Sequence, residues 1–235
     1  MIRLDSIKKS YPNGELFSNV NISIKRGMRV GLVGKNGSGK TTLLRIMLNK
    51  ESPDSGHLQV EKNLNIGYLA QEASVFRKLS VEDNLKAVLE LTTLSKEEQS
   101  AKMESLLDEF NLNKIRKSRG DLLSGGERRR TEIARALATD PKFVLLDEPF
   151  AGVDPIAVED IQKIISHLKK RNIGILITDH NVQETLAITD RTYLMFEGNI
   201  LKSGKPEDLA KDEMVRKLYL GQNFEFRKKK LDYSS

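Results

Sequence analysis

The sequence lacks several features, and each absence excludes a class of protein or site. It contains no cysteine, so it can form neither disulfide bonds nor thiolate metal sites. No apolar run reaches the roughly 18–20 residues of a membrane-spanning helix, and the first residues have no apolar stretch like that of a signal peptide. The remaining composition, 38% hydrophobic and 31% charged, is typical of a soluble globular protein in a reducing compartment. The net charge of +6 also permits contact with nucleic acid or an anionic membrane.

A glycine-rich loop between a predicted strand and a predicted helix carries the strongest functional signal. Residues 34–41 fit the pattern G-x-x-x-x-G-K-[ST] of a phosphate-binding loop. The glycines let backbone N–H groups approach phosphate oxygens, and the helix adds its positive dipole end. We expect Lys40 to reach the β- and γ-phosphates of a nucleotide, and Thr41 to give its hydroxyl to Mg²⁺. The loop by itself therefore predicts a site for a nucleotide phosphate and does not say what hydrolysis of that nucleotide would drive.

Acidic residues and a histidine follow two further predicted strands. The run 143–146 is continuously apolar, as in a parallel strand buried on both faces, and it ends in Asp147 and Glu148. Asp147 is a candidate Mg²⁺ ligand, and Glu148 is a candidate base for the attacking water. His180 follows the predicted strand 174–178 and is a candidate contact for the γ-phosphate and the water.

A second candidate phosphate site lies at residues 123–127, Leu-Ser-Gly-Gly-Glu, just before a predicted helix. A serine hydroxyl and closely approaching glycine backbone at a helix N-terminus suit an anion. In isolation, the same residues favour a Gly-Gly turn in which Ser124 caps the helix. One protomer would not easily bring this site and the glycine-rich loop onto the same ATP.

The order of the predicted elements gives an α/β fold class, with a P-loop NTPase core built on a mixed sheet. Residues 1–73 and 135–221 are expected to form this core, which includes an N-terminal antiparallel β-subdomain. Residues 74–134 have helical periodicity and predict an inserted helical subdomain, with Ser80 and Ser95 as N-caps. We expect one domain over 1–235, ending in a basic tail over 222–235.

Taken in order, these motifs resemble those of the ATP-binding-cassette (ABC) family. The matching segments are residues 34–41 (Walker A), 71 (Q-loop), 123–127 (signature), 143–148 (Walker B), 151–154 (D-loop) and 180 (switch histidine). Tyr11 falls where the family's adenine-stacking aromatic lies, although a surface or core aromatic is the simpler reading. The resemblance covers nearly the whole chain. It implies two copies bound head to tail, each ATP lying between one copy's Walker A loop and the other's signature.

The resemblance also implies a set of site residues and the cofactors ATP and Mg²⁺. The ATP-binding residues would be Tyr11, Gly34, Lys35, Asn36, Gly37, Ser38, Gly39, Lys40, Thr41, Thr42, Gln71, Ser124, Gly125, Gly126, Glu127 and Asp154. The Mg²⁺ site would use Thr41, Gln71 and Asp147. The catalytic residues would be Glu148 and His180.

Residues from about 71 onward are more narrowly similar to the ATPase subunits of lipopolysaccharide exporters. This similarity implies a subunit on the cytoplasmic face of the inner membrane, where membrane subunits contact the region around Phe76 and Arg77. Burial of Phe76 inside the helical subdomain is the alternative. Residues 1–70 are more similar to ABC-F proteins, which act on ribosomes. A soluble ribosome-associated ATPase and a hybrid of two relatives therefore remain alternatives.

Overall fold

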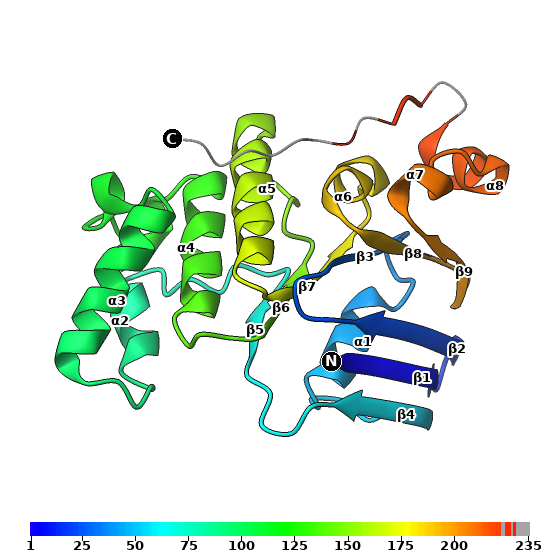
Figure 1. Cartoon of the computed structure of the whole chain (residues 1–235), viewed down its shortest axis with the longest axis horizontal. Coiled ribbons are helices and arrows are strands. Elements are labelled where there is room, and N and C mark those ends of the chain that lie inside the picture. The colour runs from blue at the N-terminus through cyan, green and yellow to red at the C-terminus, as the bar shows by residue number, and fades with distance from the viewer. Residues whose placement is uncertain (222–223, 227, 229–235) are drawn as a thin grey trace.

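The computed structural model describes residues 1–221, 224–226 and 228, and it contains two β-sheets with helices around them (Figure 1). The larger sheet has six strands in the order β5-β6-β7-β3-β8-β9. Their bounds are β5 Ile66–Leu69, β6 Phe143–Asp147, β7 Gly174–Asp179, β3 Arg29–Gly34, β8 Arg191–Phe196 and β9 Asn199–Gly204. The first five strands in this order are parallel, and β9 pairs with β8 in antiparallel fashion. The predicted mixed sheet is therefore confirmed.

The central strands of this sheet are continuous apolar runs because helices cover both of their faces. Every residue of β6 and β7 is buried. Ile175 and Ile177 pack into the cluster that contains helix α5 (Pro155–Lys170), whereas Leu176 packs into the cluster of helix α1 (Lys40–Met47). The parallel arrangement brings the carboxyl ends of β3, β6 and β7 to one edge of the sheet. The candidate functional residues follow these three ends.

The smaller sheet is antiparallel and has the strand order β2-β1-β4. Strand β1 spans Ile2–Tyr11, β2 spans Gly14–Ile24 and β4 spans Ser55–Val60. Leu4 and Phe17 belong to the same buried cluster as Leu43 of α1, so this sheet packs against the helix that follows the glycine-rich loop. The predicted antiparallel β-subdomain is therefore present.

The helical subdomain contains α2 (Val81–Leu89), α3 (Lys96–Glu109) and two short 3₁₀ turns, Asn113–Ile115 and Gly120–Leu122. Ser80 accepts the N-cap hydrogen bond of α2, and Ser95 forms a capping box with Glu98 at the start of α3. The next helix, α4 (Gly125–Leu137), crosses residue 134, where the sequence places the end of the subdomain. Helix α4 packs against both α2 and α5, so one continuous hydrophobic cluster joins the subdomain to the core.

The remaining helices complete the carboxyl-terminal part of the core (Figure 1). Helix α5 begins with Asp154 as N-cap and Pro155 as its first residue. Helices α6 (Val182–Ile188), α7 (Pro206–Leu209) and α8 (Glu213–Val215) follow, and a π-helical turn spans Arg216–Leu220. Within the described residues, no helix combines the length and apolar character needed to cross a bilayer. The predicted basic tail, 222–235, lies outside the described residues except for 224–226 and 228.

Candidate functional site

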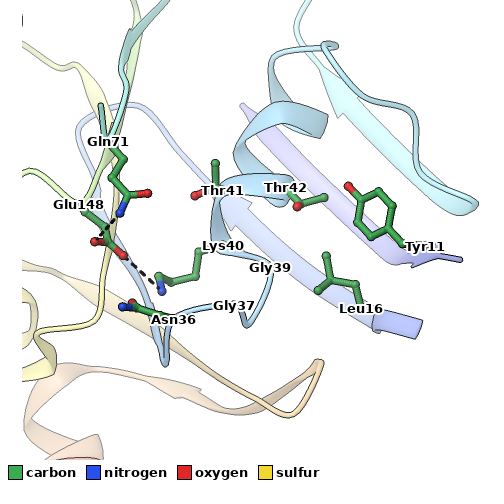
Figure 2. Close-up of a pocket in the computed structure, with 10 residues that line it drawn as sticks. All are labelled: Tyr11, Leu16, Asn36, Gly37, Gly39, Lys40, Thr41, Thr42, Gln71 and Glu148. Atoms are coloured by element: carbon green, nitrogen blue, oxygen red, sulfur yellow. Dashed lines mark hydrogen bonds and ion pairs between the residues drawn. The ribbon is translucent and has the colours of Figure 1, made fainter. Parts of the chain in front are cut away.

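A cavity of about 390 Å³ opens beside the glycine-rich loop, between the two sheets and the end of β6 (Figure 2). Its lining residues are Tyr11, Leu16, Asn36, Gly37, Gly39, Lys40, Thr41, Thr42, Gln71 and Glu148. All of these except Leu16 are sequence-predicted site residues. Leu16 was missed because nothing distinguishes it from other apolar strand residues in the sequence. Tyr11 lies on the rim and is 43% exposed, which leaves its ring accessible to a base.

The loop has the backbone that phosphate binding requires. Gly37 and Gly39 adopt positive φ angles of 79° and 97°. A side chain at Gly39 would place its Cβ 2.6 Å from a ring carbon of Phe17, so only glycine fits. Gly39 is also the N-cap of α1 and provides no side-chain acceptor. The first N–H groups of α1 are therefore available to an anion at the cavity.

The Lys40 ammonium is buried within the loop that it belongs to. It donates hydrogen bonds to the carbonyl oxygens of Gly34 (3.0 Å) and Lys35 (3.2 Å). It also lies 3.7 Å from Oε1 of Glu148 (Figure 2). The positive charge is thus held at the cavity by neutral carbonyls and one carboxylate, where a phosphate can replace the carboxylate as its partner.

Glu148 is the point at which three segments meet. Nε2 of Gln71 donates to its Oε2 at 3.1 Å, and Nδ1 of His180 lies 3.3 Å from the same oxygen. The side chain is almost fully buried, and the residue has a φ of 48°, an uncommon conformation for a residue with a side chain. Such backbone strain occurs most often at functional sites. The structure therefore brings the candidate base, the Q-loop glutamine and the switch histidine together.

Asp147 has the environment expected of a cation ligand. It is 1% exposed, and its Oδ1 accepts a hydrogen bond from Oγ1 of Thr178 at 2.5 Å. Its Oδ2 is buried and has no hydrogen-bond partner, and the Oγ of Ser38 is in the same condition. A buried carboxylate oxygen without a partner fits a hard cation such as Mg²⁺. In the described part of the chain, no cluster of three or more His, Cys, Asp and Glu residues could hold a metal by itself.

Two buried charged residues near Glu148 were not singled out from the sequence. Burial raises the pKa of Asp179 above its ordinary value, although its Oδ1 accepts a hydrogen bond from the backbone N–H of Asn181. The guanidinium of Arg129 donates to the carbonyl oxygens of Ala70, Glu148 and Pro149. Arg129 thus fixes the backbone on both sides of the cavity. Nothing in its sequence context separates it from the neighbouring arginines.

The predicted signature residues do not line this cavity. The Oγ of Ser124 accepts from the N–H of Glu127, and the Glu127 carboxylate accepts from the N–H of Ser124, which forms a capping box. The N-cap interpretation is therefore confirmed. Gly125 lines a separate cavity of about 240 Å³ with Gly152 and Val153, and the nearby Asp154 caps α5. Helices α4 and α1 lie on different parts of the molecule (Figure 1).

Phe76 lies on the surface of the helical subdomain and is 46% exposed, so the predicted alternative of a buried ring is wrong. The guanidinium of Arg135 stacks over the ring at 4.4 Å from its centre. The amide of Asn84 accepts from the N–H of Phe76 and donates to its carbonyl oxygen. An exposed aromatic ring on a fixed backbone is a suitable anchor for a partner.

Known proteins resemble this chain along most of its length. Two of them are the lipopolysaccharide export system ATP-binding protein LptB of Acidithiobacillus ferridurans (46% identity, covering 96% of this chain and 98% of that protein) and a probable ABC transporter ATP-binding protein of Azorhizobium caulinodans (48%, covering 93% and 82%). The structure superposes on MJ1267, an ATP-binding cassette of an ABC transporter, with a TM-score of 0.82 at 27% identity, covering 94% of this chain and 99% of that one. It also superposes on the dimeric structure of MJ0796, a bacterial ABC transporter cassette, with a TM-score of 0.77 at 25% identity, covering 88% and 99%.

The family match agrees with the site. Residues 17–151 match the ABC transporter family, and this segment contains the glycine-rich loop, Gln71, the 123–127 motif and Glu148. Sequence, fold and site therefore converge: the chain belongs to the ABC transporter family, as one of its ATP-hydrolysing cassettes.

Proposed function

We propose that the chain is the ATPase subunit that powers a membrane exporter whose cargo is lipopolysaccharide. The observation that carries this proposal is the 46% identity to the lipopolysaccharide export subunit of Acidithiobacillus ferridurans, because it extends over 96% of this chain and 98% of that protein. A similar subunit from Escherichia coli (strain K12) is 45% identical over 93% of the chain.

The same coverage bears on the ribosome-associated alternative. A match over 96% of the chain includes most of residues 1–70, so the similarity to exporter subunits does not begin at residue 71. The relatives therefore do not favour an ABC-F-like function.

In the proposed reaction, ATP lies in the cavity beside the glycine-rich loop. Tyr11 covers the base, while the first N–H groups of α1 and the Lys40 ammonium hold the phosphates. Glu148 accepts a proton from the water that attacks the γ-phosphorus, and the bond from this phosphorus to the oxygen bridging to the β-phosphate breaks, which releases ADP and inorganic phosphate. The contacts of Gln71 and His180 with the Glu148 carboxylate support this assignment, because they fix the direction in which the carboxylate points.

Mg²⁺ is the proposed metal cofactor, and Thr41, Gln71 and Asp147 are the residues that would hold it; Thr41 and Gln71 line the cavity. The buried, unpartnered Oδ2 of Asp147 supports this choice. When bound, the ion neutralises charge on the β- and γ-phosphates. The protein's own contribution is to hold the Asp147 carboxylate in place through the hydroxyl of Thr178.

We further propose that two copies form a head-to-tail dimer around ATP. Ser124 to Glu127 and Asp154 lie outside the cavity of their own protomer, yet their helix N-termini suit an anion. The dimeric form of the structurally similar cassette MJ0796 supports this arrangement. Each ATP would then contact residues 34–42 of one copy and residues 124–127 of the other.

The membrane subunits are proposed to dock on the turn around Phe76 and Arg77, which would place the protein on the cytoplasmic face of the inner membrane. A pull-down from detergent-solubilised membranes tests both the function and this surface. The wild-type chain is expected to recover integral membrane partners that form a lipopolysaccharide exporter, and ribosomes in a parallel pull-down should not bind. Recovery of ribosomal proteins alone would overturn the exporter function.

The variant Phe76→Ala separates docking from hydrolysis. It is expected to recover less than about a tenth of the membrane partners, since an aromatic anchor contributes roughly 2 kcal/mol or more. Basal ATP hydrolysis should remain close to wild type because Phe76 is not among the residues that line the cavity. Leu91→Ala is the matched control, because Leu91 is 85% exposed on the same subdomain. Equal recovery with all three proteins would contradict the docking surface.

A further inference from the structure

A second polar cleft, of about 550 Å³, lies where the two sheets meet. It is lined by Met1, Arg3, Leu4, Asp5, Asn21, Ile22, Ser23, Lys25, Arg191, Tyr193 and Ser203. Arg191 pairs with Val30 at the beginning of β3, whereas Met195 pairs with Gly34, where β3 enters the glycine-rich loop. The cleft is therefore at the opposite edge of the large sheet from the nucleotide cavity. It is also the larger of the two cavities.

The charges along this cleft are predominantly positive. Arg3, Lys25 and Arg191 line it, and Asp5 is the one carboxylate among its lining residues. The Nε of Arg3 bonds Asp5 at 2.8 Å, so this carboxylate is already neutralised. Among the described residues, neither the Lys25 ammonium nor the Arg191 guanidinium has a carboxylate partner. Two cations thus face one cleft with no counter-charge from the protein.

Arg191 is held in a fixed position rather than extended into solvent. One of its terminal nitrogens donates to Oγ of Ser203 at 2.9 Å, and its guanidinium lies 5.3 Å from the centre of the Tyr193 ring. The hydroxyl oxygen of Tyr193 in turn accepts a hydrogen bond from the backbone N–H of Ser23 at 3.2 Å, which leaves the hydroxyl hydrogen free to donate. A guanidinium fixed by stacking and by one hydrogen bond loses little entropy when its remaining N–H groups bind an anion.

From this arrangement we propose that the cleft binds a phosphate-bearing anion, with Arg191 and Lys25 as its principal contacts. A guanidinium fork matches two phosphate oxygens, and the ammonium of Lys25, the residue that follows β2, supplies a second charge. The ligand would join β2 of the small sheet to β8 of the large sheet, so its binding would stabilise the contact between the two sheets. The phosphate can be free in solution or carried on a lipid headgroup.

The first arm of the test uses inorganic phosphate as the probe. Mg–ADP is kept at saturation so that the glycine-rich loop is occupied, and backbone amide NMR signals are followed during titration. Saturable shifts are expected at Ser23 and Thr192, which border the cleft. In the double variant Lys25→Gln with Arg191→Gln, the apparent affinity should fall at least about tenfold. A second double variant, Lys25→Gln with Arg191→Lys, should bind phosphate more tightly than the first, because lysine restores the positive charge at position 191 without the guanidinium fork.

The second arm uses vesicles of phosphatidylcholine with and without phosphatidic acid, in a sedimentation assay with the same variants. The matched control is the double variant Lys62→Gln with Lys114→Gln. Both lysines are exposed and lie outside the cleft, and the control loses two positive charges, as the double variant of Lys25 and Arg191 does. The cleft variant is Lys25→Gln with Arg191→Gln. If phosphate shifts the amide signals of the wild type but not those of the cleft variant, free phosphate is the ligand. Binding to phosphatidic acid vesicles, lost in the cleft variant but not in the control, identifies a lipid-borne phosphate. Absence of both signals in the wild type, or equal loss in both double variants, overturns the proposal.

Discussion

At the scale of single residues, the chemistry converges on the Glu148 carboxylate. Gln71 and His180 contact one of its oxygens, and the Lys40 ammonium lies near the other. Gln71 follows β5, His180 follows β7, and Lys40 lies at the end of the glycine-rich loop. A carboxylate held from three sides is fixed in direction, which a general base requires before its substrate arrives.

Replacing Glu148 with glutamine tests the assignment of the base. The Glu148→Gln variant keeps the shape of the side chain and should bind ATP as tightly as wild type, but its turnover should fall by about 100-fold or more. Filter binding with labelled ATP and a phosphate-release assay measure the two quantities. Asp160→Asn, an exposed carboxylate on α5, serves as the control. Undiminished hydrolysis in Glu148→Gln would exclude a general-base role.

Asp179 gives a prediction about pH. Burial, with a smaller contribution from the nearby Glu148 charge, raises the pKa of Asp179 in the folded protein above its ordinary 3.8. The charged form is therefore disfavoured by folding, and this cost appears as pH rises from about 3.8 through the folded-state pKa. Asp179→Asn removes the cost, so the free energy of unfolding of the variant minus that of the wild type should be larger at pH 7 than at pH 4. Urea unfolding at both pH values measures the difference, and a difference independent of pH would contradict the prediction.

At the scale of elements, the side chain of Asn84 holds the backbone of Phe76 itself, while Glu132 and Arg135 hold the nearby Ser74. Asn84 is fully buried in α2, and its amide bonds both backbone groups of Phe76 and the carbonyl oxygen of Ser80. Gly120 packs against the same turn, where a Cβ would lie 2.9 Å from the Phe76 carbonyl oxygen. The position of the exposed ring is thus determined by buried hydrogen bonds rather than by the ring itself.

Asn84→Ala should therefore weaken docking without touching the docking residue. The lost amide leaves the N–H of Phe76 without a partner, while its carbonyl oxygen keeps the hydrogen bond from the N–H of Leu79. The free energy of unfolding should therefore fall by roughly 1–3 kcal/mol. Because the turn should become less ordered, the variant should capture fewer membrane partners, while basal ATP hydrolysis is retained. Urea unfolding and the membrane pull-down measure these effects, with Asn113→Ala on the exposed side of the subdomain as the control. Full capture by Asn84→Ala would show that the turn does not need this support.

Much of the element pattern could be predicted from the sequence because its signals are local. The apolar runs of β6 and β7, the capping boxes at Ser95 and Ser124, and Pro155 after its N-cap all act within a few residues. The full length of β1 and β2 could not be predicted, because their outer residues are held by pairing with each other and not by an apolar pattern. Likewise, the buried contacts of Arg129 depend on carbonyl groups that lie far away along the chain.

At the scale of the whole molecule, two candidate phosphate-binding features occur on one chain but at separate places. The cavity beside the glycine-rich loop has no lining residue from the 123–127 motif, and Gly125 belongs to another cavity. The sequence indicates that one protomer would not easily bring both features onto the same ATP. The fold agrees, because α4 and α1 lie on different parts of the molecule (Figure 1). In the proposed dimer, a second copy related by a twofold axis would resolve the difficulty, because each loop would receive the other copy's motif.

Mixing two inactive variants tests whether the site is shared between copies. Lys40→Met removes the phosphate-binding ammonium, and Ser124→Arg blocks the motif at the N-terminus of α4, so each variant alone should have little ATPase activity. In a mixed dimer, one of the two sites carries both defects and the other carries neither. Random pairing of equal amounts makes half of the dimers mixed, so activity should recover to about a quarter of the wild-type rate. Phosphate release from the equimolar mixture measures this recovery. If each chain built a complete site by itself, the mixture would be no more active than its two components, because every chain in it would carry one of the defects.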